Sequence, residues 1–189
     1  DKPLIINSGK AQQLLVREKS KDGKTYSLLS KNFAVKNIKR QDPKSVTILW
    51  DASVSAAVGR QRKLDFVQAY LATLKDGVSI YLSVFRNTPE KTVHFTVKNG
   101  GAAALIKTLA DITYDGATRL THRFIQEKAH NSDIALLFTD GLVTLGQEEQ
   151  HSITVPLLIL NGALKSNHIL LESLVDTSRG IYLDLNKIS

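Results

Sequence analysis

The sequence predicts an α/β fold: an open, doubly wound and mostly parallel sheet preceded by an N-terminal β-hairpin. From residue 45 onward, apolar segments of strand length alternate with segments of helical periodicity. Two of the strand-length segments, 46–50 and 133–138, are rich in apolar residues, which is typical of strands buried on both faces of a parallel sheet. Strands that are separated by helices imply right-handed crossovers and therefore a doubly wound arrangement.

The first 44 residues differ from the remainder and predict the hairpin. We expect strands at Gln13–Lys19 and Thr25–Val35, because the pair Asp22-Gly23 between them is a strong turn signal. The stretch Lys36–Lys44 is polar and contains an Asp-Pro pair, so we interpret it as a linker. The main domain is then predicted to cover residues 45–189.

The elements of this domain follow one another in a regular order. The first strand, Val46–Trp50, ends at Asp51 and is expected at the centre of the sheet. A helix follows, with Leu64, Val67, Leu71 and Leu74 on its apolar face and Gly77 after its last turn. Next we expect strands at Val78–Phe85 and Thr92–Val97, the second an antiparallel edge strand, then a helix at Ala102–Ala110 and a loop at Tyr114–Ala117 leading into another helix. The last elements are strands at Asp133–Phe138 and Thr154–Leu160, a helix capped by Ser166 and running through Val175, and a strand at Ile181–Leu185.

Composition restricts the classes of partner. The formal charge is +7, but residues 1–44 hold 11 Lys and Arg against 4 Asp and Glu, whereas residues 45–189 hold 14 of each. Aromatic residues make up 6% of the chain and are not interleaved with basic clusters, so no nucleic-acid partner is expected. No apolar run approaches the roughly 20 residues of a bilayer-spanning helix, so this segment is not expected to insert into a membrane. The chain begins at Asp1 and has no Met, so we expect a processed segment of a longer product. It has no Cys, which excludes disulfides, thiolate metal sites and cysteine nucleophiles.

The candidate chemistry lies where two predicted strands end. Asp51, Ser53 and Ser55 place one carboxylate and two hydroxyls at every second residue of one loop, and Asp140 follows the strand at 133–138. Open parallel sheets bind ligands beyond the carboxyl ends of their strands, near the switch in strand order. A set made only of oxygen donors suits a hard cation such as Mg²⁺, and Mn²⁺ would also fit.

The pattern D-x-S-x-S, followed by a Thr in a second loop and an Asp in a third, resembles the metal-ion-dependent adhesion site of von Willebrand factor A domains, which have a Rossmann-like fold. Here Asp51, Ser53 and Ser55 match the first loop, Thr118 the second and Asp140 the third. The resemblance covers roughly residues 45–186. It implies that the serines and the threonine contact a Mg²⁺, Mn²⁺ or Ca²⁺ ion, whereas the aspartates hold it mainly through water. Val54, Ala56 and Ala117 depart from the usual residues of the motif, and the bulkier Val54 is expected to restrict how the loop wraps the ion.

The same resemblance implies a function in binding rather than catalysis. The cation would take a carboxylate from a partner protein, so the chain is not expected to be an enzyme, and adhesion in an extracellular or cell-envelope location is implied. The hairpin and linker before the domain resemble the layout of inter-α-trypsin-inhibitor heavy chains and their bacterial relatives, in which a VIT domain precedes the A domain. Residues 1–44 would then be a remnant of that VIT domain.

Two alternatives remain open at the level of sequence. Aspartate-tipped strands also occur in Mg²⁺-dependent phosphate-handling enzymes of doubly wound fold, although these usually carry a second aspartate where this chain has Ser53. A structural spacer with a degenerate metal site is the other. Within the site, Thr121 could replace Thr118 as the threonine ligand. The five histidines are scattered, and no P-loop or nucleophile-elbow motif is present.

Overall fold

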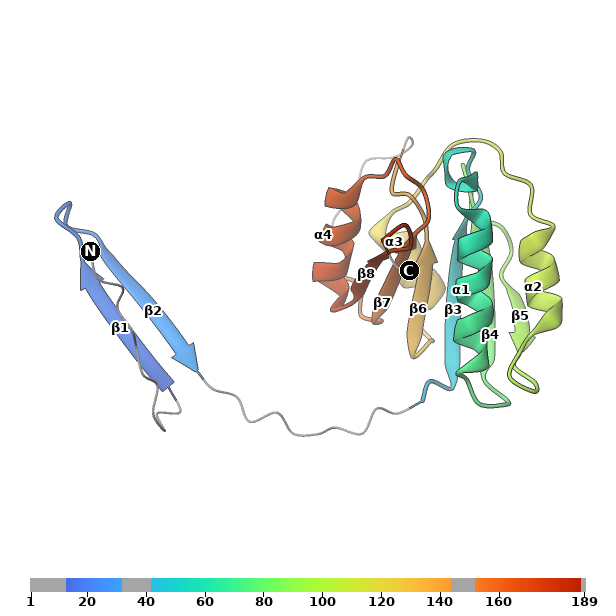
Figure 1. Cartoon of the computed structure of the whole chain (residues 1–189), viewed down its shortest axis with the longest axis horizontal. Helices are drawn as coiled ribbons and strands as arrows, with labels where there is room; N and C mark the ends of the chain where they lie inside the picture. Colours follow the sequence, from blue (N-terminus) through green and yellow to red (C-terminus); the bar gives the residue numbers. More distant parts are fainter. Residues whose placement is uncertain (1–12, 32–41, 144–151, 188–189) are drawn as a thin grey trace. The chain divides into compact units, whose positions relative to one another are not determined.

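The computed structural model describes residues 13–31, 42–143 and 152–187 (Figure 1). The chain divides into two compact units, Asp1–Arg40 and Gln41–Ser189. Most of the predicted linker lies outside the described residues. Within the described residues, no helix is both long and apolar enough to cross a membrane.

The first unit contains the predicted hairpin. Strands β1 (Gln13–Lys19) and β2 (Thr25–Lys31) pair antiparallel. In the turn, the Gly23 amide donates to the Ser20 carbonyl at 3.0 Å, and Gly23 adopts a φ of 84° that favours glycine. The hairpin is therefore confirmed, while its predicted extension through residues 32–35 lies outside the described residues.

The second unit is built on a six-stranded sheet with the order β5-β4-β3-β6-β7-β8. Every neighbouring pair is parallel except β4 with β5, so the predicted antiparallel edge strand is confirmed. The bounds are β3 Ser45–Asp51, β4 Ser79–Phe85, β5 Val93–Thr96, β6 Ile134–Phe138, β7 Leu157–Asn161 and β8 Ile181–Asp184.

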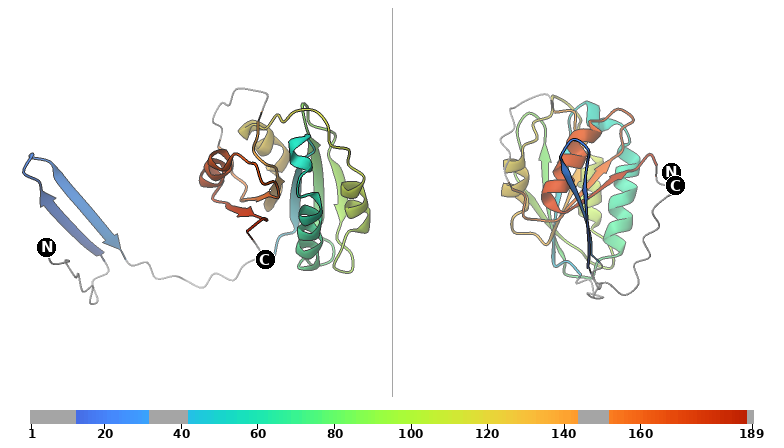
Figure 2. Two further views of the ribbon diagram at one scale, coloured as in Figure 1. Left: turned by 45° about the horizontal axis from the view of Figure 1, so that its top comes forward. Right: turned by 90° about the vertical axis from the view of Figure 1, so that its left-hand side faces the viewer.

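Helices cover both faces of this sheet (Figure 2). Along β3, Ile48 and Trp50 belong to the core under α1 and α2, whereas Leu49 belongs to the core under α3 and α4. This alternation is why an almost continuously apolar strand is required at the centre of the fold. The bounds are α1 Arg60–Ala72, α2 Ala103–Ala110, α3 His122–Ala129 and α4 His168–Ser178, with a short 3₁₀-helix η1 at Ser55–Ala57.

Several predicted boundaries are wrong: α1 ends at Ala72, before Leu74, and α4 continues beyond Val175 to Ser178. Two further differences have a clear physical reason. The strand predicted from Thr154 begins at Leu157, directly after Pro156, which has no amide to donate to a neighbouring strand. Ser166 does not cap the last helix: the Asn167 side chain accepts from the Leu170 amide at 3.1 Å. Serine and asparagine both favour the N-cap position of a helix, so the path of the backbone determines which of the two caps α4.

The order of the strands determines where a ligand can bind. From β3 the chain proceeds to β4 and β5 on one side, and it later returns to the other side of β3 with β6, β7 and β8. The switch in strand order therefore lies between β3 and β6. We call the edge at which these parallel strands end the carboxyl edge, and the opposite edge, where they begin, the amino edge. Asp51 closes β3 at the carboxyl edge.

Candidate functional site

The loop after β3 is organised around the Asp51 carboxylate, which is fully buried. One oxygen, Oδ1, accepts from the Ser53 amide at 2.9 Å, which fixes the first turn of the loop. The hydroxyl oxygens of Ser53 and Ser55 lie 3.4 Å apart. Ser53 is 1% exposed, and Ser55, at the start of η1, is partly exposed. The three predicted residues of the first loop are thus adjacent in space.

Thr118 reaches the same carboxylate from the loop between α2 and α3. Its hydroxyl lies 3.5 Å from Asp51 Oδ2, and its side chain is buried. The amide of Val54 donates to the Gly116 carbonyl at 3.3 Å, which joins the two loops through their backbones. Thr121, the alternative ligand, instead caps α3 by accepting from the Phe124 amide at 3.1 Å. The geometry therefore favours Thr118 over Thr121 as the threonine of this cluster.

Asp140 follows β6 and completes the cluster of predicted side chains. Its Oδ1 accepts from the Leu142 amide at 2.9 Å. Its Oδ2 is buried and has no hydrogen-bond partner within the described residues. Buried polar atoms are almost always paired, so this oxygen is suited to an additional ligand.

Thr139 is a member of the site that the sequence reasoning did not assign. Its hydroxyl donates to Asp51 Oδ2 at 2.6 Å and accepts from the Gly141 amide at 3.1 Å. It therefore connects the loop after β6 to the carboxylate at the end of β3. A hydroxyl residue directly before the strand-ending Asp140 is the signal that could have identified it.

The electrostatics of the cluster reflect its burial. Burial raises the pKa of the Asp51 carboxyl above its ordinary value of 3.8, and the Asp140 charge acts in the same direction. Hydrogen bonds from Thr139 and Ser53 oppose that rise. Two carboxylates that repel each other and lie among hydroxyl oxygens fit a hard divalent cation such as Mg²⁺, and the free oxygen of Asp140 supports this fit.

The departures from the adhesion-site motif do not strain the backbone. Val54 has a φ of −56° and a ψ of −44°, which any residue adopts, and its side chain is 62% exposed. Its bulk therefore extends into solvent, and the expected restriction of the loop is not seen in the backbone. Ala117 lies outside the left-handed region as well, and its amide donates to Asn87 Oδ1 at 2.7 Å. Above the cluster lies a cavity of about 380 Å³, lined by Ser53, Val54, Ser55, Gly116, Ala117, Thr118 and Leu142.

A buried lysine beneath the loop is the second feature that the sequence reasoning missed. Lys63, in the first turns of α1, is 2% exposed, and its Nζ donates to the Ala56 carbonyl. The ammonium lies over the ring of Trp50, 5.2 Å from the ring centroid. Trp50 itself is fully buried and packs against Phe138 at 4.8 Å between ring centroids, so its ring is part of the core beside the site.

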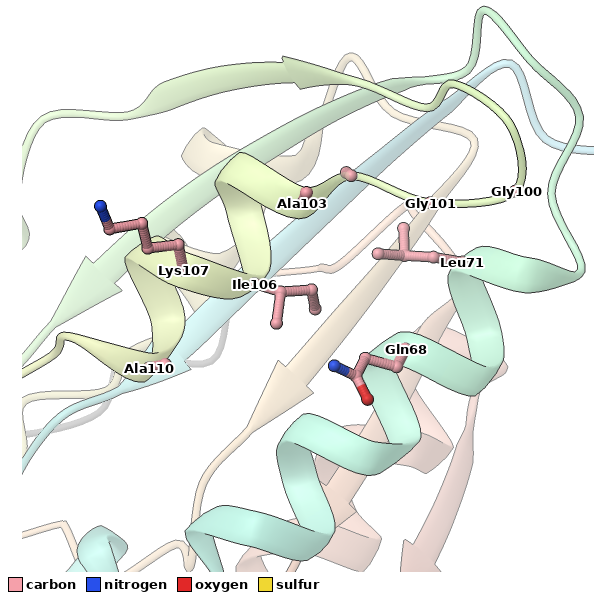
Figure 3. Close-up of a pocket in the computed structure, with 9 residues that line it drawn as sticks. Gln68, Leu71, Gly100, Gly101, Ala103, Ile106, Lys107 and Ala110 are labelled. Carbon is pink, nitrogen blue, oxygen red and sulfur yellow. The ribbon is translucent and has the colours of Figure 1, made fainter.

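A larger cavity lies away from this site, between α1 and α2 (Figure 3). Its volume is about 470 Å³, and aliphatic side chains such as Leu71 and Ile106 dominate its lining, with Gln68 and Lys107 as its long polar side chains. None of the predicted site residues lines it.

Among the residues that the structure describes, no three His, Cys, Asp or Glu side chains gather as metal ligands. That finding does not test the predicted site, which has two carboxylates and three hydroxyls.

Comparisons with known proteins agree with the fold. No protein-family model and no curated protein sequence matches the chain. Among solved structures, a von Willebrand factor type A protein from Catenulispora acidiphila matches with a TM-score of 0.56 at 13% identity, over 93% of this chain and 42% of that one. The PilB minor pilin from Streptococcus sanguinis matches with a TM-score of 0.50 at 10% identity, over 92% of this chain and 73% of that one.

These similarities concern the fold alone, because the identities are low. The chain has an α/β fold of the von Willebrand factor A type, and the predicted fold class is confirmed. It spans less than half of the length of the Catenulispora acidiphila protein.

Proposed function

We propose that this chain is a protein-binding module that recognises an acidic group of its partner through a bound divalent cation, preferably Mg²⁺. The von Willebrand A-type fold, which is used widely for protein interaction, supports the general class. The observation that carries the cation is Asp140 Oδ2, a buried carboxylate oxygen with no partner within the described residues. It lies in the same loop cluster as three hydroxyls and a second carboxylate.

In this proposal each residue has a distinct role. Ser53, Ser55 and Thr118 offer neutral hydroxyl oxygens to the cation, and Asp51 and Asp140 supply the negative charge that holds it. Because Mg²⁺ prefers octahedral coordination and these five side chains do not fill all of its positions, the bound cation remains an acceptor for a carboxylate from another protein. Thr139 keeps Asp51 oriented by its 2.6 Å hydrogen bond. The function is binding, and no bond is broken in the partner.

Isothermal titration calorimetry with MgCl₂ and MnCl₂ tests the cation. The unmodified chain should bind one ion, and Asp51→Asn should lose binding because half of the local negative charge is removed. The matched control is Asp133→Asn, an aspartate at the amino edge of the same sheet, which should bind as the unmodified chain does. No binding by the unmodified chain, or equal binding by Asp51→Asn, would overturn the proposal.

A second measurement separates binding from catalysis. With Mn²⁺ bound, acetate should reduce the water-proton relaxation enhancement, because its carboxylate replaces water at the ion, whereas acetamide should not. Turnover of p-nitrophenyl phosphate that requires Mg²⁺ and vanishes in Asp51→Asn would instead favour the phosphate-handling enzyme. A folded chain that binds neither ion would favour the structural spacer.

This proposal has two further parts. The chain has an adhesive role outside the cell, and residues 1–44 originate from a VIT-type domain.

A further inference from the structure

Lys63 holds a positive charge against the loop that carries Ser53 and Ser55. The side chain is 2% exposed, although lysine is almost never fully buried without a partner. Its Nζ donates to the carbonyl of Ala56, the residue after Ser55 in the site loop. The charge thus lies at the base of the loop that is predicted to hold the cation.

Aromatic rings and backbone keep the ammonium in place. Nζ lies 5.2 Å from the ring centroid of Trp50 and 5.4 Å from that of Tyr114. The Trp50 indole donates to the Tyr114 hydroxyl at 3.0 Å, which fixes the two rings relative to each other. A Cβ added to Gly162 would lie 3.4 Å from Lys63 Cγ, so the stem is also confined from that side. The ammonium cannot reach solvent without displacing these groups.

The two buried carboxylates of the site act on this charge. Burial lowers the pKa of Lys63 to about 8, while Asp51 and Asp140 oppose that shift by favouring the charged form. The ammonium form therefore predominates at pH 7. Arg60 is the remaining charge that acts on the group, and it opposes protonation.

These groups form one buried electrostatic unit with two negative charges and one positive charge. The attraction that Asp51 and Asp140 exert on the ammonium is mutual, so without a metal the Lys63 charge stabilises both carboxylate charges. When a divalent cation enters, the same ammonium repels it. A single fixed charge thus favours the metal-free state and opposes the loaded state.

We propose that Lys63 is a built-in counter-cation of the candidate metal site: it stabilises the buried carboxylates when no metal is bound and weakens the binding of a divalent cation. The statement about metal affinity rests on the proposed function. The statement about the carboxylates does not, because it concerns the metal-free chain.

A double-mutant cycle in EDTA tests the metal-free part. Unfolding by urea is measured for the unmodified chain, Lys63→Met, Asp140→Asn and the double variant. Lys63→Met should raise the unfolding constant about tenfold more when Asp140 is present than when Asn replaces it, because only the carboxylate loses a counter-charge. A lysine that only packs, or that only donates to Ala56, would give the same change in both backgrounds and would overturn the proposal.

Metal titration tests the other part. Lys63→Met should bind Mg²⁺ about tenfold more tightly than the unmodified chain, because the fixed repulsion is gone. Lys107→Met, on the exposed side of α2, is the matched control and should leave the affinity unchanged. Equal or weaker Mg²⁺ binding by a folded Lys63→Met would overturn this part. If the unmodified chain binds no metal, the proposed function fails, and the double-mutant cycle still decides the role of Lys63.

A second variant separates charge from hydrogen bonding. Lys63→Gln removes the charge but keeps a donor for the Ala56 carbonyl, so it should bind Mg²⁺ more tightly, as Lys63→Met does. If Lys63→Met does not fold alone, adding Asp140→Asn should restore folding. A double variant that folds no better than Lys63→Met would overturn the charge account, because one of the two uncompensated carboxylates has then been removed.

Discussion

Two aspartates at opposite ends of β6 differ in how the chain satisfies them. Asp133, at the amino edge, accepts from the amides of Lys44 at 2.8 Å and Ser45 at 3.0 Å, and from the Ser45 hydroxyl at 3.1 Å. These bonds, led by that from Lys44, hold the pKa of the Asp133 carboxyl below its ordinary value. Asp140, at the carboxyl edge, is buried with one oxygen unpartnered within the described residues.

The difference separates a structural carboxylate from one that is suited to a ligand. Asp133 ties the start of β3 to the start of β6, and the chain itself supplies its donors. Asp140 is removed from water without an equivalent set of donors, which is unfavourable unless something else provides the positive charge. The same residue type in the same sheet therefore lies in two different environments.

One glycine at each edge, Gly59 and Gly77, shows how differently two loops of the sheet are packed. Gly59, after η1 at the carboxyl edge, has a φ of 73°, and a Cβ there would lie 2.1 Å from the Gly162 carbonyl oxygen. Gly77, before β4 at the amino edge, has a φ of 87°, but a Cβ there would meet nothing within 4 Å. Of these two positions, only 59 thus requires glycine for space as well as for conformation.

The largest expected effect tests this difference in packing. Gly59→Ala should lower the free energy of unfolding by about 3 kcal/mol or more, because the new methyl group meets backbone that cannot rotate away. Gly77→Ala should cost only about 1 to 2 kcal/mol, which is the penalty of the left-handed conformation. Urea denaturation of the two variants provides the comparison. Equal losses of unfolding free energy in the two variants would mean that the loops at Gly59 and Gly162 move apart easily to accommodate the methyl group.

A smaller effect distinguishes the two aspartates. In EDTA, Asp133→Asn should lower the free energy of unfolding by about 1 kcal/mol, because charge-assisted hydrogen bonds to two amides are weakened. Asp140→Asn should cost less than about 0.5 kcal/mol or should stabilise the chain, since the cost of burying this charge with an unpartnered oxygen balances or outweighs its attraction to Lys63. Thermal unfolding monitored by circular dichroism gives both values.

Added Mg²⁺ should reverse that order. At about 100 times the dissociation constant, it should stabilise the unmodified chain and Asp133→Asn by about 2.7 kcal/mol, and it should leave Asp140→Asn unchanged. A Mg²⁺-dependent stabilisation of Asp140→Asn equal to that of the unmodified chain would contradict the assignment of the two roles.

The sequence predicts which residues meet at the carboxyl edge, because short sequence patterns determine where the buried strands end. Apolar segments that end on Asp51 and near Asp140 indicate two buried parallel strands, and the strand order brings their ends together. Thr118 was predicted from its place in the motif, and its contact with Asp51 agrees with that order. Whether these residues bind a metal stays a prediction.

Features that depend on contacts between distant loops could not be predicted in the same way. Lys63 precedes the apolar Leu64 at the start of a helix, where a lysine is ordinarily exposed. Its burial results from the close approach of Gly162, about a hundred residues later in the chain, and from the ring of Tyr114. No spacing rule along one helix contains that information.

The smallest expected effect concerns pH at the amino edge. Because the folded pKa of Asp133 lies below its unfolded value near 3.8, its contribution to stability is present above about pH 4 and is lost as the pH falls through the lowered pKa. The side chain is exposed, so the contribution is about 1 kcal/mol at most. The difference in the free energy of unfolding between the unmodified chain and Asp133→Asn should therefore shrink from pH 5 to about pH 3. Every other carboxyl group is common to both chains and cancels. A difference that stays constant over this range would mean that Asn at position 133 disturbs packing rather than the hydrogen bonds of the carboxylate.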